Sequence, residues 1–98
     1  MIHHDRLDYA MFVVRTALAR YERLPAEAIR PDHQLHADLG VDAFDLALVA
    51  VRIEDELDVD LDLGDVTFEE KTTVRELASL VARACEERTR RDVVPKSA

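Results

Sequence analysis

Three segments of this chain repeat apolar residues at helical spacing, and glycine hardly interrupts them. In the first segment the apolar residues lie three or four apart, with Ala10 and Ala17 beside them: Leu7, Met11, Val14, Leu18 and Tyr21. This spacing places them on one stripe of a helix, which Asp5 would cap and which would end before Pro25 and Pro31. Only two glycines and three prolines occur in 98 residues. The chain is therefore predicted to be all-α.

A long connection follows this helix, and a shorter acidic one precedes the last helix. The first runs from about Glu22 to Val41, a length that is unusual unless the loop is functional or internally packed. Three apolar residues in it are expected to anchor in the core: Ile29, Leu35 and Leu39. The stretch 58–64 alternates polar and apolar residues but has no partner strand, so a loop is predicted, with a short helical turn within 64–70. The last helix follows Thr72 or Thr73, with one apolar stripe: Val74, Leu77, Val81 and Ala84.

A helix predicted from Asp42 to Leu57 carries two apolar stripes. Asp42 is suited to cap it, with Asp45 three residues later in a capping-box-like arrangement. One side forms a core stripe: Leu46, Val49, Ala50, Ile53 and Leu57. Residues on nearly the opposite side lie four, three and four apart: Phe44, Leu48, Val51 and Asp55. A helix in so small a domain cannot bury both sides, so the second stripe is expected to meet a partner. In the alternative, Phe44 folds back onto the long connection, and Leu48 and Val51 are ordinary surface residues.

The acidic residues concentrate on this same helix and the loop after it. The formal net charge is −8, and residues 42–62 hold eight acids against Arg52 alone, a local net charge of −7. Such a field repels nucleic acid and anionic lipid and attracts basic protein surfaces, although a merely solvated acidic face is an alternative. No apolar run approaches the roughly 20 residues of a membrane span, and no secretion signal opens the chain. Cys85 is the single cysteine and cannot form an internal disulfide, so we expect a reducing, cytoplasmic location. We also expect a monomer without membrane insertion.

Other chemistry-bearing residues give weaker signals. Four histidines, His3, His4, His33 and His36, lie near the terminus or in the long connection with no cysteine near them in sequence, and no metal site is predicted. Cys85 adjoins the apolar stripe of the last helix without an obvious base, which favours a packing role. Glu54 and Glu56 face different sides of their helix, so paired-acid catalysis is not indicated. The chain is not expected to be an enzyme.

One run of residues makes a specific match to a known family. The run Asp38-Leu39-Gly40-Val41-Asp42-Ala43-Phe44-Asp45 resembles the acyl carrier protein signature, Asp-Leu-Gly-x-Asp-Ser-Leu-Asp, at all but two defined positions. Residues 53–61 resemble the acidic end of the family's second helix. Thr72-Thr73-Val74 resembles the opening of its last helix, after a loop about two residues longer than usual. The resemblance covers roughly residues 5–86.

The resemblance implies a fold and a function. It implies a four-helix bundle of acyl-carrier type with a long first loop and a short third helix, here over residues 1–88, before a disordered tail at 89–98. Family members carry 4'-phosphopantetheine on the signature serine and perform no chemistry themselves. They present thioester-bound intermediates to enzymes of fatty-acid, polyketide or related biosynthesis. The implied partners are enzymes with basic and apolar docking surfaces. The residues implied to meet them are Asp42, Phe44, Asp45, Leu48, Val51, Glu54 and Asp55.

Two departures from the family pattern bear on this function. The signature serine aligns with Ala43, which has no hydroxyl to be phosphopantetheinylated, and the only serines are the distant Ser79 and Ser97. Leu48 occupies a position that is often acidic in the family. Ala43 is either an engineered replacement that keeps a true carrier unmodified, or the native residue of a carrier-like adaptor or regulator. A phosphopantetheinyl transferase would then be a partner only if serine were restored at position 43.

Overall fold

The computed structural model describes residues 2–61 and 72–93, and this part of the chain is helical and without strands. The elements are α1 (Ile2–Glu22), a short 3-10 helix η1 (Ala26–Ala28), α2 (Ala43–Leu57) and α3 (Val74–Val93). The predicted short helical turn within 64–70 lies outside the described residues. None of the described helices combines the length and apolar character that a membrane span requires.

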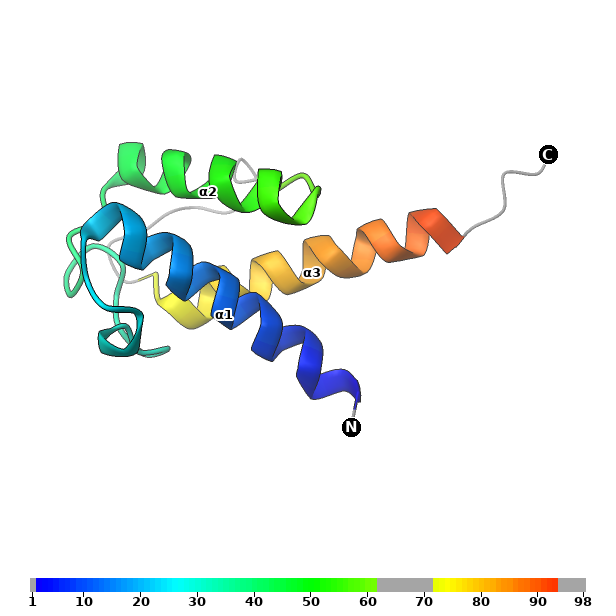
Figure 1. Ribbon diagram of the computed structural model, residues 1–98, viewed down its shortest axis with the longest axis horizontal. Coiled ribbons are helices and arrows are strands. Elements are labelled where there is room, and N and C mark those ends of the chain that lie inside the picture. The colour runs from blue at the N-terminus through cyan, green and yellow to red at the C-terminus, as the bar shows by residue number, and fades with distance from the viewer. Residues whose placement is uncertain (1, 62–71, 94–98) are drawn as a thin grey trace.

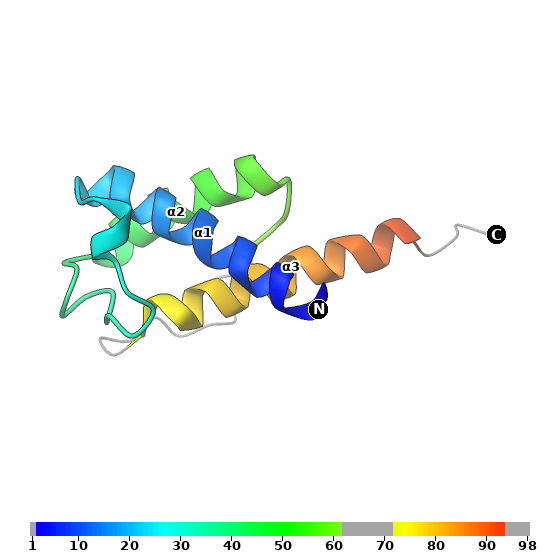
Figure 2. The same cartoon turned by 60° about the horizontal axis from the view of Figure 1, so that its bottom comes forward.

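Of the three long helices, α2 and α3 run in the same direction and α1 runs opposite to both, and the connection between α1 and α2 lies at one end of the molecule. Figure 1 shows α1 and α2 running in opposite directions, with α3 antiparallel to α1 and extending beyond both of them. The view in Figure 2 agrees, and places the α1–α2 connection beside the start of α3. The end of α1, the start of α2 and the start of α3 therefore meet at this end.

The core consists of aliphatic side chains from all three helices and their connections. The largest fully buried side chains are Leu18, Ile29, Leu35, Ile53, Val14, Val41, Val49, Val74 and Val81. The predicted anchors Ile29, Leu35 and Leu39 are all buried, so that prediction is confirmed. All aromatic side chains of the described residues are exposed instead: Tyr9, Phe12, Tyr21 and Phe44. Aliphatic burial thus stabilises the fold, and the aromatic area remains in contact with water.

The first helix differs from its prediction at its start and in the burial of its apolar stripe. It begins at Ile2, so Asp5 lies within it and does not cap it. Leu7 and Tyr21, the first and last residues of the predicted apolar stripe, are each 40% exposed, whereas Val14 and Leu18 between them are buried. The helix ends before Pro25 as predicted, and Arg23 adopts a left-handed φ of 58° there. The Leu24 N–H donates to the Ala19 carbonyl at 3.1 Å, which is the long bond of a Schellman motif.

The last helix begins with a reciprocal cap. The Glu76 N–H donates to Thr73 Oγ1 at 3.2 Å, and the Thr73 N–H donates to Glu76 Oε1 at 2.8 Å. Its predicted stripe is confirmed, since all four residues are buried: Val74, Leu77, Val81 and Ala84. The helix continues to Val93, so residues 89–93, predicted to be disordered, are helical. Residues 94–98 lie outside the described part.

Candidate functional site

The start of α2 is positioned by the start of α3, although 31 positions separate Ala43 from Val74 in sequence. The Leu35 N–H donates to the Thr72 carbonyl at 2.8 Å, and the Val74 N–H donates to the His33 carbonyl at 2.9 Å. Gln34 and Thr73, between these bonds, form an isolated antiparallel bridge. The connection that leads into α2 is thereby attached to the first turn of α3.

A compact turn then brings the chain from this bridge to α2. The Gln34 N–H donates to Asp38 Oδ2 at 2.7 Å, and the Val41 N–H donates to the Leu35 carbonyl at 2.8 Å. Gly40 adopts a φ of +73°, which favours glycine. A Cβ built there would meet no atom within 4 Å, so the backbone conformation and not lack of space accounts for glycine. Val41 is buried and fixes the end of the turn in the core.

Asp42 caps α2 as predicted, and Ala43 is the first residue of the helix. The Asp45 N–H donates to Asp42 Oδ1 at 2.8 Å, and the Leu46 N–H donates to the Asp42 carbonyl at 2.9 Å. Among the described residues, no acceptor meets the N–H groups of Ala43 and Phe44. Ala43 is exposed, so its methyl group stands in solvent at the positive end of the helix dipole.

A third carboxylate, missed by the sequence analysis, joins Asp42 and Asp45 at this helix end. Burial raises the pKa of Glu22, and the nearby charges of Asp45 and then Asp42 raise it further. Glu22 ends α1, and 20 residues separate it from Asp42, so no local pattern could reveal this proximity. The end of α1 and the start of α2 therefore bring three carboxylates close enough for their charges to interact.

The outward face of α2 is apolar at its first two turns and acidic further along. Phe44 is 70% exposed, Val51 55% and Leu48 37%, and Asp55 is also exposed. Phe44 therefore does not fold back onto the connection, so this part of the alternative is wrong; the role of Leu48 and Val51 stays a prediction. The opposite face is buried at Leu46, Val49, Ala50 and Ile53, as predicted, whereas Leu57 is only half-buried.

The acids at the end of α2 also take part in local structure. Glu54 is half-buried, and its Oε2 accepts the Leu61 N–H at 2.8 Å, which holds the loop after the helix. Asp58 adopts a left-handed φ of 56° and pairs with Arg88 of α3 at 3.0 Å. One carboxylate oxygen of Glu54 is thus committed to the fold, which the helical spacing did not indicate.

Residues 13–81 match the family described as the phosphopantetheine attachment site, and the chain belongs to this family of acyl carrier proteins. The match includes the turn, the Asp42 cap and the whole of α2. No curated protein matches the chain significantly. Family membership supports a phosphopantetheine-carrier role for a protein of this class.

Position 43 carries no hydroxyl oxygen to which the family's prosthetic group could be joined. A phosphodiester needs a hydroxyl oxygen, and no serine, threonine or tyrosine occurs between residues 24 and 66. Ala43 offers only a methyl group at the first turn of α2. Ser79, in α3, lines a different part of the molecule.

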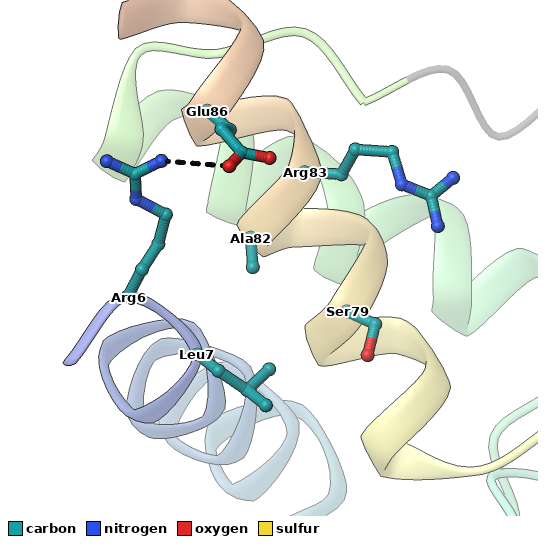
Figure 3. A pocket seen from close by; sticks show the side chains of 6 residues that line it. All are labelled: Arg6, Leu7, Ser79, Ala82, Arg83 and Glu86. Atoms are coloured by element: carbon teal, nitrogen blue, oxygen red, sulfur yellow. Dashed lines mark ion pairs between the residues drawn. The ribbon is translucent and has the colours of Figure 1, made fainter. Parts of the chain in front are cut away.

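That other part is a shallow pocket of about 290 Å³ between α1 and α3 (Figure 3). Arg6 and Glu86 pair across it at 3.5 Å, and Arg83 extends away from α1. Leu7 and Ala82 supply apolar surface. The pocket lies toward the start of α1, whereas position 43 lies beside its end, so the two sites are separate.

Cys85 and the histidines of the connection show no reactive arrangement. Burial raises the pKa of the Cys85 thiol, although Arg6 and Arg88 oppose this effect, so the thiol stays protonated at neutral pH. His33 Nδ1 accepts the Arg30 N–H at 3.0 Å and thereby stabilises a turn. In the part of the chain that the structure describes, no three potential metal ligands lie together.

Proposed function

We propose that this chain is an acyl-carrier-type protein in a form that cannot be phosphopantetheinylated. Its α2 surface would meet cytoplasmic enzymes of fatty-acid, polyketide or related thioester biosynthesis. The observation that carries this proposal is the placement of Ala43. It is exposed at the first position of α2, directly after the Asp42 cap, where the family signature has its serine. The turn, the cap and the exposed stripe around Ala43 lie within the part of the chain that matches the family, which supports the proposal.

The proposed docking surface consists of seven residues: Asp42, Phe44, Asp45, Leu48, Val51, Glu54 and Asp55. Phe44, Leu48 and Val51 supply apolar contact area, which contributes most to affinity when it is buried in a partner's pocket. The acids steer a basic enzyme surface toward it and contribute more to the association rate than to affinity. Glu54 contributes least, because one of its carboxylate oxygens already accepts the Leu61 N–H.

A second function is supported by the same surface. The apolar face of α2 is exposed and complete without any hydroxyl at position 43. A native Ala43 would therefore make the chain a carrier-like adaptor or regulator that binds a biosynthetic enzyme without delivering a substrate.

Restoring the hydroxyl distinguishes these two functions. Incubated with coenzyme A and a broad-specificity phosphopantetheinyl transferase, the chain with Ala43 should gain no mass. The Ala43→Ser variant should gain the mass of one phosphopantetheine arm by intact mass spectrometry. The exposed substitution should change stability by no more than about 0.5 kcal/mol.

Ala47→Ser is the matched control, because Ala47 is also exposed on α2 but lies one turn later. It should remain unmodified, which shows that position 43 and not any serine on α2 is the acceptor. If a folded Ala43→Ser variant stays unmodified with several transferases, the surface has diverged from that of a carrier, and the adaptor function is favoured.

A further inference from the structure

The outward face of α1 carries an exposed stripe that neither the core nor the proposed function uses. Its residues lie three, four and four apart: Tyr9, Phe12, Thr16 and Arg20. Phe12 is 64% exposed and Tyr9 56%, and Thr16 and Arg20 are exposed as well. No acid of the described residues pairs with Arg20. This α1 stripe is therefore aromatic in its first half and basic at its end.

The exposed stripe of α2 complements the α1 stripe, because it too is apolar first and charged last along the helix, with the opposite charge. The α2 stripe (Phe44, Leu48, Val51 and Asp55) is apolar first and acidic last. Each stripe spans eleven residue steps, or about 17 Å of helix. In a parallel alignment Tyr9 lies opposite Phe44, and Phe12 opposite Leu48. Arg20 then lies opposite Asp55 at the far end.

This complementarity cannot be satisfied within one molecule. In the chain α1 and α2 run in opposite directions, and each packs in the bundle through its buried face (Figure 1). Both stripes therefore face solvent, and a parallel pairing between them requires two molecules. The chain itself holds both halves of the complementary pair, which favours a second copy over an unrelated partner.

We propose that the α1 stripe of one molecule docks on the α2 stripe of a second copy, head to tail. Such a heterologous contact leaves one free stripe at each end, so association does not stop at a dimer. Four side chains from each molecule form a contact well below the roughly 800 Å² per partner of a stable complex. The net charge of −8 also opposes contact between copies. The association is therefore weak and reversible, and it competes with any enzyme that docks on α2.

Charge exchange between Arg20 and Asp55 tests this contact by sedimentation velocity over a wide concentration range. The unchanged chain should show a weight-average sedimentation coefficient that rises with concentration. Arg20→Glu and Asp55→Arg should each abolish this rise, because each places like charges opposite one another. An equimolar mixture of the two variants should restore it. The glutamate introduced in one variant then meets the arginine introduced in the other, and the unchanged Arg20 and Asp55 of the two variants form the original pair.

The controls carry the same charge changes at exposed positions away from both stripes. Arg75→Glu and Glu87→Arg, both on α3, should associate like the unchanged chain. Phe12→Ser should weaken association and Tyr21→Ser should not, which provides a second test should a charge variant fail to fold by circular dichroism. The proposal is overturned if the unchanged chain stays monomeric throughout, if the single charge variants associate normally, or if their mixture stays monomeric.

Discussion

At the scale of single residues, Ile53 and Leu48 show how one helix separates stability from recognition. Ile53 is fully buried, whereas Leu48 on the other face is 37% exposed. Ile53→Ala should lower the free energy of unfolding by about 2–5 kcal/mol, because it removes buried methyl groups and leaves a cavity. Leu48→Ala should lower it by less than about 1 kcal/mol. Urea unfolding followed by far-UV circular dichroism measures both, and equal losses would show that the orientation of α2 is wrong.

Ionisation of Glu22 should lower the stability of the fold as the pH rises, whereas ionisation of a salt-bridged acid raises it. The pKa of Glu22 in the folded state lies above the ordinary 4.5, because of burial and the charges of Asp45 and Asp42. The ionised carboxylate therefore lowers the free energy of unfolding. This loss reaches its full size above the folded-state pKa of Glu22, and it disappears as the pH falls below the unfolded-state value of 4.5. Glu22→Gln should be more stable than the unchanged chain at pH 7, with an advantage that shrinks toward pH 4.5.

The control for Glu22 is Glu27→Gln, at an exposed position in η1. Stability differences are obtained from urea unfolding at several pH values, so that acid effects common to all variants cancel. An advantage of Glu22→Gln that is the same at every pH would contradict the proposed cause.

At the scale of elements, the Thr73–Glu76 cap should contribute measurably to α3. Thr73→Ala removes the oxygen that accepts the Glu76 N–H, and it should lower the free energy of unfolding by about 1 kcal/mol. Thr73→Ser keeps this oxygen and should retain most of the stability. Urea unfolding measures the difference, and a Ser variant as unstable as the Ala variant would show that the γ-methyl group matters more than the cap.

Elements with local signals were predictable from sequence, and long-range attachments were not. The Asp42 cap, the threonines before Val74 and the apolar periodicity behind them predicted α2 and α3, because caps and stripes depend on neighbours in sequence. The start of α1 was misplaced because Asp5 resembles a cap but lies within the helix. The bridge of Gln34 to Thr73 and the approach of Glu22 to Asp42 depend on how distant segments pack, and no periodic pattern encodes them.

At the scale of the whole molecule, the acidic and apolar face of α2 should control recognition by a carrier-modifying enzyme. In the Ala43→Ser background, Val51→Ser removes exposed apolar area from this face without disturbing the core. It should lower the kcat/KM of phosphopantetheine transfer several-fold, mainly through KM, because docking precedes transfer. Leu24→Ser is the control, since Leu24 is also exposed but lies before η1, outside the docking surface. Equal effects of the two substitutions would remove Val51 from the docking surface.

The exposure of the aromatic residues also determines the intrinsic fluorescence of this protein. The sequence has no tryptophan, and both tyrosines, Tyr9 and Tyr21, are exposed in the folded chain. Neither ring is fully buried in the fold, so tyrosine emission should change only modestly when the fold is lost. Tyr9, on the outward face of α1, changes surroundings only when another surface covers it. Intrinsic fluorescence of this protein is therefore a poor indicator of folding and a direct reporter of contacts made at α1.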